Sequence, residues 1–373
     1  MLKKLYIFMK NILFVISGVF CLFSNPSISQ IVEPTIITAL PTCLHESSGI
    51  EAENTNSIWT HNDSGDSARI YQIDTLGNIL RNICFQVDSA IDCEESTRDT
   101  NGNYYLGDFG NNSNDRTNLR IYKITNPDSI TTSTIIPELI TFRFEDQELF
   151  PPDSAHMDFD CEAMFHFQDS LYLFSKNRSG NMFCKMYRLP DVAGDYIAEL
   201  VDSFNTGTWI TSADINAAGN KMVLLSESRL WLFSDIQGTN FFDGNAQMFN
   251  MYFSQKEAVV FVDDSTLYLT DEYLFGTGGN LLRICMNELS STLNEKILNQ
   301  PWFYPNPAMN HIQINPLIVP DHFTIVVSDM KGNKILFFKN KTEIDLYTLK
   351  SGIYCITLIM PDQTIQSSFI KID

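Results

Sequence analysis

The chain alternates between short apolar runs and polar turns, and residues 33–286 nowhere show the 3.6-residue periodicity of an amphipathic helix. The runs are rich in aromatic and β-branched residues and are separated by Asn, Asp, Ser and Gly, which is typical of strands joined by turns. One type of run, an apolar strand ending in polar residues, occurs five times: 58–63, 104–108, 171–176, 222–227 and 267–272. The sequence therefore predicts an all-β body built from a repeat.

Each copy of this strand has the same two neighbours in the sequence. A short acidic element precedes it, at 46–50, 92–96, 160–164, 212–215 and 257–259. A second strand follows it, at 69–71, 120–122, 185–187, 230–232 and 283–284. A period of about 45–65 residues fits one four-stranded blade with its loops. Residues 30–288 are therefore predicted to form a five-bladed β-propeller, with six blades as the alternative.

The last copy of the repeat stops near Met286, before a fourth strand. The segment from Glu33 to Leu40 has the pattern of a strand that belongs to no repeat of its own. We predict that this segment completes the last blade and closes the ring, because closure removes the open sheet edges.

Residues 1–29 are predicted to be a cleavable signal peptide. They begin with a basic segment, continue with the apolar run 12–23, and end in the small residues of Ser27-Ile28-Ser29, which place cleavage before Gln30. A run of about 12 residues is too short to span a hydrocarbon core of ~30 Å as a stable helix. No other segment is long and apolar enough, so the mature chain is expected to have no transmembrane helix.

After a linker predicted at 289–301, residues 302–373 carry four blocks in order: a Pro-Asn-Pro turn, a hairpin turn, an Ile-Asp-Leu segment and a Gly-Ile-Tyr strand. Their key residues are Tyr304, Pro305, Asn306, Pro307, Asp329, Gly332, Gly352 and Tyr354. These blocks resemble the type A sorting domain of the type IX secretion system. The resemblance implies a small β-sandwich that engages the type IX machinery. It also implies export through the periplasm to the cell surface or the medium.

Charge and cysteine content narrow the class of partner. The formal charge is -20, and it becomes -23 when residues 1–29, with three lysines and no acid, are removed. Such a surface repels nucleic acid and suits calcium, a cationic ligand, or solubility alone.

No Cys-x-x-Cys pair occurs, which argues against a zinc knuckle. Cys93 and Cys161 begin neighbouring repeats at equivalent positions, too far apart for a disulfide, and are expected to pack in the core.

Four segments of the first two repeats resemble a group of uncharacterised secreted bacterial β-propeller proteins: 46–49, 59–65, 92–94 and 107–112. Relatives in this group tend to have Trp where Cys93 and Cys161 stand, so the packing there is expected to differ. The resemblance implies a fold and a secreted setting, and no particular activity.

In a propeller the innermost strand of each blade lines a central channel, so the acidic elements predict a ring of carboxylates. The candidate binding residues, including those at the ends of the second strands, are Glu46, Asp92, Glu94, Asp160, Glu162, Asp214, Glu257, His61, Asp108, Lys176 and Asp271. The same reasoning adds Asn62, Asp63 and Glu272 at this mouth. Converging carboxylates raise one another's pKa unless a cation lies among them.

Oxygen ligands of this density favour calcium, with Glu94, Glu162 and Asp214 as candidate ligands. The carboxylates could instead accept hydrogen bonds from loop amides and have no further role. Two functions therefore remain open. One is a secreted or surface propeller that binds an extracellular ligand at the channel mouth. The other is a calcium-assisted hydrolase of glycans or phosphoesters, with two carboxylates as acid and base. The sequence predicts neither the ligand nor the substrate.

Overall fold

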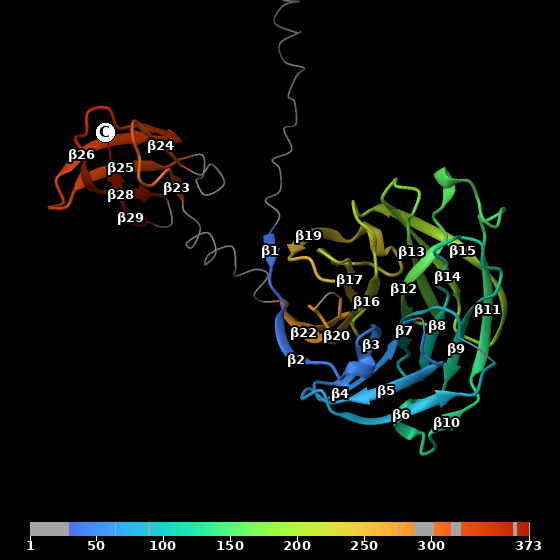
Figure 1. Cartoon of the computed structure of the whole chain (residues 1–373). Helices are drawn as coiled ribbons and strands as arrows, with labels where there is room; N and C mark the ends of the chain where they lie inside the picture. Colours follow the sequence, from blue (N-terminus) through green and yellow to red (C-terminus); the bar gives the residue numbers. More distant parts are fainter. Residues whose placement is uncertain are drawn as a thin grey trace, which may run out of the picture.

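The computed structural model describes residues 30–286 except 64, 89 and 275, together with residues 302–314, 322–360 and 364–372 (Figure 1). The predicted signal peptide at 1–29 and linker at 289–301 lie outside the described residues. The described chain is all-β, and the helical elements whose bounds are described are four 3-10 turns: η1 (Thr42–Leu44), η2 (Pro127–Ser129), η3 (Ser154–His156) and η4 (Phe241–Asp243). None of these could span a membrane.

Most of the strands described between residues 30 and 286 form five antiparallel groups of four. The first group is β3 (Ser47–Asn54), β4 (Ser57–Asn62), β5 (Arg69–Ile73) and β6 (Ile79–Phe85). The second is β7 (Cys93–Arg98), β8 (Tyr104–Asp108), β9 (Leu119–Ile124) and β11 (Glu138–Phe144). The third is β12 (Asp160–Phe167), β13 (Ser170–Lys176), β14 (Phe183–Pro190) and β15 (Gly194–Asn205). The fourth is β16 (Ser212–Ile215), β17 (Lys221–Leu225), β18 (Arg229–Ser234) and β19 (Asn245–Met251). The fifth is β20 (Lys256–Asp263), β21 (Thr266–Asp271), β22 (Asn280–Cys285) and β2 (Thr35–Ala39).

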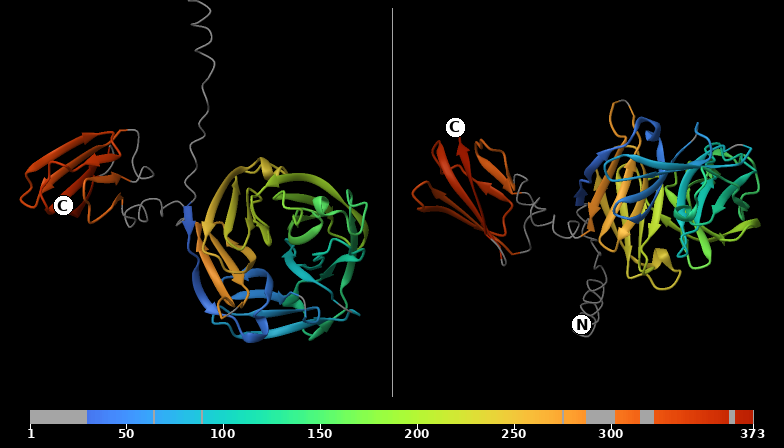
Figure 2. Two further views of the ribbon diagram at one scale, coloured as in Figure 1. Left: turned by 45° about the horizontal axis from the view of Figure 1, so that its top comes forward. Right: turned by 90° about the horizontal axis from the view of Figure 1, so that it is seen from below.

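The five groups are arranged around a ring (Figure 2), with the first strand of each group innermost (Figure 1). Strands β3, β7, β12, β16 and β20 pack against one another in that order, and β20 packs back against β3. A hydrophobic cluster of buried residues fills each boundary between neighbouring groups of the described ring. Cys93 and Cys161 are buried in two of these clusters, in agreement with the packing role predicted for them. All seven described cysteines are free.

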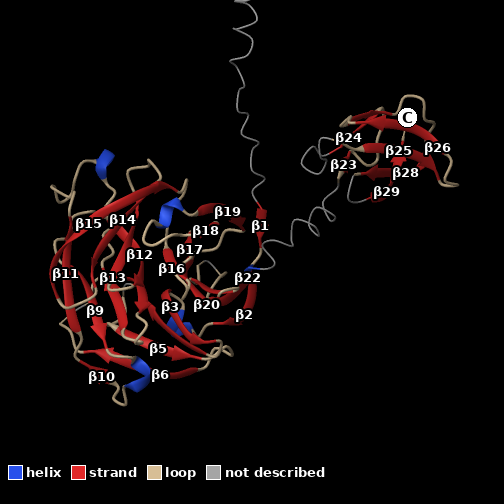
Figure 3. Cartoon of the chain, turned by 180° about the vertical axis from the view of Figure 1, so that it is seen from behind, coloured by secondary structure: helices blue, strands red, loops and turns tan. Residues whose placement is uncertain are grey.

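Strand β2 confirms the predicted closure, because it pairs antiparallel with β22 from Thr35 opposite Arg283 to Ala39 opposite Asn280. Leu40, just after β2, is buried between the first and the fifth group. Three parallel pairings were not predicted: β1 (Gln30–Val32) on β19, β10 (Thr134–Ile135) on β6, and β11 on β15. The last of these joins the second and third groups into one eight-stranded sheet at the outer rim (Figure 3).

Three of the described hairpins have the same five-residue turn, Asp-x-x-Gly-Asn. In the turn between β5 and β6, the Asp74 carboxylate accepts hydrogen bonds from the backbone N–H groups of Leu76 and Asn78. Gly77 takes φ +83°, a left-handed conformation that glycine adopts without steric cost. The same pattern recurs at 99–103 and 329–333. These turns fix the register of the strands on either side.

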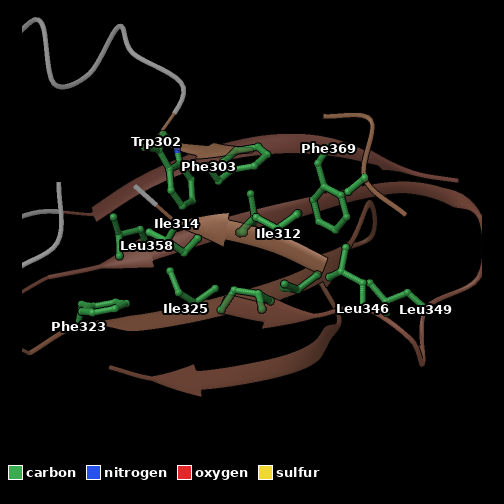
Figure 4. Packing of buried hydrophobic residues seen from close by; sticks show 14 of the residues in the cluster. Trp302, Phe303, Ile312, Ile314, Phe323, Ile325, Leu346, Leu349, Leu358 and Phe369 are labelled. Atoms are coloured by element: carbon green, nitrogen blue, oxygen red, sulfur yellow. The ribbon is translucent and has the colours of Figure 1, made fainter. Parts of the chain in front are cut away.

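The C-terminal region forms two sheets over one core (Figure 4). One sheet contains β23 (Phe303–Tyr304), β24 (His311–Ile314) and β27 (Glu343–Asp345). The other contains β26 (Lys334–Lys339), β25 (Thr324–Asp329), β28 (Gly352–Ile359) and β29 (Thr364–Lys371). Asn306 of the Pro-Asn-Pro turn ties the sheets together, because its side chain accepts from the N–H of Ile370 and donates to the carbonyl of Ser368. The Pro-Asn-Pro turn thus has a direct structural use.

Candidate functional site: the mouth of the ring

Strand pairing brings the acidic elements and the ends of the second strands to one end of the ring. In the third group Asp160 lies opposite Lys176, and in the fifth group Lys256 lies opposite Asp271. In the first group Ser47 lies opposite Asn62. In these three groups the start of the inner strand therefore lies beside the end of the next strand, as the sequence predicted.

A β-bulge at the start of the inner strand aims one side chain of each of four groups inward. The register shifts at Ser48 in β3, Glu94 in β7, Glu162 in β12 and Glu257 in β20. A bulge leaves one residue unpaired and redirects its side chain. These four residues all line the same cavity, so the bulge is the local device that builds the site.

This mouth cavity has a volume of about 100 Å3 and a polar lining. Its side chains come from the first, second, third and fifth groups and include five acids and two bases: Ser48, Asp63, Glu94, Asn112, Glu162, Lys176, Arg178, Gln255, Glu257 and Glu272. The excess of acids gives the cavity a negative potential, which attracts cations or hydrogen-bond donors.

The third group contributes the basic side of the cavity. Lys176 Nζ lies 3.0 Å from Glu162, and Arg178 lies 2.5 Å from Asp160 and 3.4 Å from Glu162. Both cations also lie over the indole of Trp209, at 6.0 and 5.3 Å from the ring centroid. Burial and Asp160 raise the pKa of Glu162, while Lys176 opposes that rise. Trp209 is 40% exposed, so the cationic pair carries an aromatic platform beside the cavity.

The first and second groups contribute the acidic side. Asp63, Asp92 and Glu94 place carboxylate oxygens within 4.8 Å of one another. Burial, followed by the charges of Glu162 and Asp63, raises the pKa of Glu94 well above its usual value. Burial also raises the pKa of Asp92, which Arg116 opposes. This side of the cavity therefore has a strong preference for a bound proton or cation.

The fifth group adds two carboxyl groups whose pKa values lie near neutrality. Burial raises the pKa of Glu257 to about 7, although Lys176 lowers it. Burial and the nearby Glu257 raise the pKa of Glu272 to about 8. Gln255 donates a hydrogen bond to Glu272. Both groups can gain or lose a proton under ordinary conditions, as acid–base chemistry or pH-dependent binding requires.

A further acidic set lies among the inner strands outside this cavity lining. Burial and Asp214 raise the pKa of Glu51, and burial raises that of Asp214 to about 7. Glu95 accepts hydrogen bonds from the hydroxyl of Ser212 and the N–H of Ser96. Burial raises the pKa of Glu95 well above its usual value.

The predicted calcium ligands Glu94, Glu162 and Asp214 do not form one set. Strand β16 has no bulge in its pairing with β17, so Asp214 stays in the regular pleat and accepts a 2.6 Å hydrogen bond from the N–H of Phe261. Asp214 is not among the residues that line the mouth cavity. Glu162 is matched by Lys176 and Arg178. The structure instead brings Glu94 together with Asp63 and Asp92.

Asp108 and Asp271 are also placed away from the cavity lining. Asp108 is fully buried and forms ion pairs of 2.8 Å with both Arg116 and Arg120. It also accepts hydrogen bonds from the N–H groups of residues 91 and 92, so it anchors the start of β7. Asp271 accepts from the N–H and the side chain of Asn280. Both act as structural acceptors.

His61 and Glu46 are not among the residues that line the cavity. His61 is 1% exposed, and its Nδ1 bonds the carbonyl of Asn62. Burial lowers the pKa of His61 to about 4, so the ring is neutral at neutral pH. Glu46 lies in the turn before β3, where its backbone carbonyl accepts from the N–H of Asp63. Its charge contributes to the raised pKa of Glu272.

Sequence reasoning missed Arg178 and Trp209. Arg178 follows Lys176 by two residues and sits just beyond the predicted strand, and Trp209 precedes the fourth acidic element by three residues. Equivalent loop positions next to each repeat could have been searched for bases and aromatics. The contact between the two residues depends on loop conformation, which the strand pattern does not specify.

A larger cavity of about 270 Å3 lies elsewhere in the described residues, beside Lys185. Its other lining residues all come from the connection 146–159 between β11 and β12. The mouth cavity is the stronger functional candidate, because four separate groups contribute to it.

Residues 302–372 match the family described as "Secretion system C-terminal sorting domain". This region is therefore a type IX sorting domain, and the protein is exported to the cell surface or secreted. No curated protein matches the chain.

Three solved structures give distant similarities. The extracellular domain of a putative one-component system from B. thetaiotaomicron is 10% identical with a TM-score of 0.32, covering 87% of this chain and 57% of that one. A functionally unknown protein from Desulfotomaculum acetoxidans DSM 771 is 14% identical with a TM-score of 0.33, covering 65% and 69%. The extracellular domain of a putative hybrid two-component system from B. thetaiotaomicron is 13% identical with a TM-score of 0.31, covering 92% and 46%. The TM-scores are too low to assign a fold or a function. The chain spans 57% of the first of these structures.

Proposed function

We propose that residues 30–288 form a five-bladed β-propeller that binds an extracellular ligand at the mouth of its central channel. Residues 302–373 form a β-sandwich that takes this binding module to the cell surface or the medium. Support for the propeller comes from the five antiparallel groups, the closed circle of inner strands and the pairing of β2 with β22. Closure by a strand from the other end of the chain removes the edges of the last sheet.

One observation carries the binding function: four bulged inner strands direct Ser48, Glu94, Glu162 and Glu257 into the same cavity. A bulge interrupts strand pairing, and its repetition in four groups has a clear use only if the inward-facing side chains meet a ligand. The inward carboxylates are buried, which is costly unless a partner offsets the loss of hydration.

Exposed aromatic side chains flank the cavity lining. Trp209 lies beside Lys176 and Arg178, and Tyr273 follows Glu272 directly. Tyr252 and Phe253, 63% and 68% exposed, precede Gln255 by two or three residues. Aromatic surfaces around a polar pocket bind molecules with both an apolar face and polar groups. We therefore propose a ligand that carries hydrogen-bond donors or a positive charge together with an apolar face, such as a sugar or a basic peptide.

A hydrolase of glycans is the second candidate, because Glu257 and Glu272 both line the cavity with pKa values of about 7 and about 8. General acids and bases work best when their pKa lies near the working pH. Phosphoesters fit less well, since the lining has more acids than bases.

The test is to screen the exported protein against immobilised glycans and basic peptides, and against chromogenic glycosides for hydrolysis. Binding to any probe should fall at least tenfold in Trp209→Ala. It should remain unchanged in Tyr347→Ala, which removes an aromatic side chain of 72% exposure from the sorting domain. Hydrolysis that is lost in Glu257→Gln would favour the enzyme. Binding that both aromatic variants retain would place the ligand elsewhere.

A further inference from the structure

Glu94 is a buried carboxylate without a matching donor. It is 5% exposed, it occupies the bulge of β7, and it lines the mouth cavity. No described residue donates a hydrogen bond to its side chain or forms an ion pair with it. Removing a carboxylate from water without a partner is strongly unfavourable. The position therefore requires a bound proton or a cation from outside the protein.

Two further carboxylates converge on the same point. Oxygens of Asp63, Asp92 and Glu94 lie within 4.8 Å of one another. A Cβ on Gly110 would stand 2.2 Å from Glu94 Oε1 and 2.5 Å from Asp92 Oδ2, so both carboxylates press against the bare backbone of that glycine. Two ligands of one calcium ion at about 2.4 Å can be at most about 4.8 Å apart. The spacing of the three oxygens thus fits one ion.

The nearby basic side chains already form ion pairs with other carboxylates. Lys176 and Arg178 form ion pairs with Glu162 and Asp160 on the opposite side of the cavity. Arg116, which lowers the pKa of Asp92, forms its own ion pair with Asp108. The bases closest to Asp92 and Glu94 are therefore already paired with other acids.

We infer that Asp63, Asp92 and Glu94 bind one calcium ion between the first and second groups of the ring. Carboxylate oxygens are the preferred ligands of calcium, and its flexible coordination tolerates an open cavity that can supply water for the remaining positions. Magnesium demands nearly ideal octahedral geometry and loses its water reluctantly, so it fits less well. This inference rests on the mouth cavity of the proposed function and deepens it, because the ion would supply a positive charge to the acidic side.

The test is a thermal unfolding series on the full exported protein, stripped of metals with EDTA and then titrated with calcium chloride alone. At a hundredfold excess over Kd, calcium should raise Tm by about 5 °C. Asp92→Asn and Glu94→Gln should each lower calcium affinity at least tenfold. Glu199→Gln, which removes an exposed carboxylate that pairs with Arg188 and does not line the cavity, should keep the wild-type affinity.

Several outcomes would overturn the inference. They are a wild-type Tm that calcium does not change, a Glu94→Gln protein that binds calcium as the wild type does, or an equal shift with magnesium chloride. Asp92→Asn serves as the second variant if Glu94→Gln folds poorly, with far-ultraviolet circular dichroism as the check. No organic ligand is present in this experiment, so its failure leaves the glycan and peptide screen to decide the proposed function separately.

Discussion

Glu94 Oε1 lies against the backbone of Gly110, at only 2.2 Å from the point where a side chain on residue 110 would begin. Gly110→Ala should therefore push the carboxylate out of the cavity and destabilise the ring by about 1–3 kcal/mol, as overpacking does. Urea unfolding measures this loss. Gly352→Ala is the matched control, because its nearest contact for a Cβ is an ordinary 3.6 Å, and it should change stability little. Equal stability of Gly110→Ala and the wild type would contradict the packing described here.

Ring closure depends on β2 and on Leu40 at its end. Leu40 is 4% exposed and packs in the cluster between the first and fifth groups. Leu40→Ala should cost about 2–5 kcal/mol, the usual range for a buried leucine, and should lower the Tm of the body in one cooperative step. Ile36→Ala, in the same strand at 62% exposure, should cost less than about 1 kcal/mol. Similar losses in both variants would argue against a closing role for this segment.

Asp108 illustrates a carboxylate whose role is structural. Its side chain is fully buried between Arg116 and Arg120. Asp108→Asn should cost about 3 kcal/mol, because it leaves two partly buried cations without their partner. Arg188 and Glu199 form an exposed pair at 2.6 Å, and Glu199→Gln should change stability by no more than about 1 kcal/mol. Chemical denaturation of both variants measures the contrast, and a cost at Asp108 as small as that at Glu199 would refute it.

Stability without calcium should fall as the pH rises from about 6.5 to 8. The pKa values of Glu257 and Glu272 are raised to about 7 and about 8 in the folded protein, so the folded state holds more protons than the unfolded state in this window. Raising the pH then favours unfolding. The lowered pKa of His61, about 4 against 6.5, acts in the opposite direction and only below about pH 6.5.

Tm measured in EDTA at several pH values checks this sign, and the double variant Glu257→Gln with Glu272→Gln should flatten the slope. A Tm that rises between pH 6.5 and 8 would mean that these carboxyl groups are ionised at little cost, which their burial does not allow.

The repeat pattern predicted the body well because alternation and turn residues report local strand formation. It placed Glu94, Glu162, Lys176 and Glu257 at one mouth, where the cavity contains all four. It placed Asp214 in the same ring, but Asp214 is not in the cavity lining, because β16 pairs with β17 without the bulge that turns the other inner side chains inward.

The pattern also gave no sign that Arg178 would neutralise Glu162 and Asp160, or that β11 would pair with β15 in parallel. Both depend on loop conformation and on which sheet edges meet, and these are set by tertiary packing.

The most direct test of the mouth as the functional site is a crystal structure of the exported protein grown with calcium chloride. We predict five four-stranded blades around a channel, with one ion at 2.3–2.6 Å from oxygens of Asp63, Asp92 and Glu94, the range that calcium takes with oxygen ligands. A mouth in which these three carboxylates point apart, with no ion among them at saturating calcium, would contradict the account.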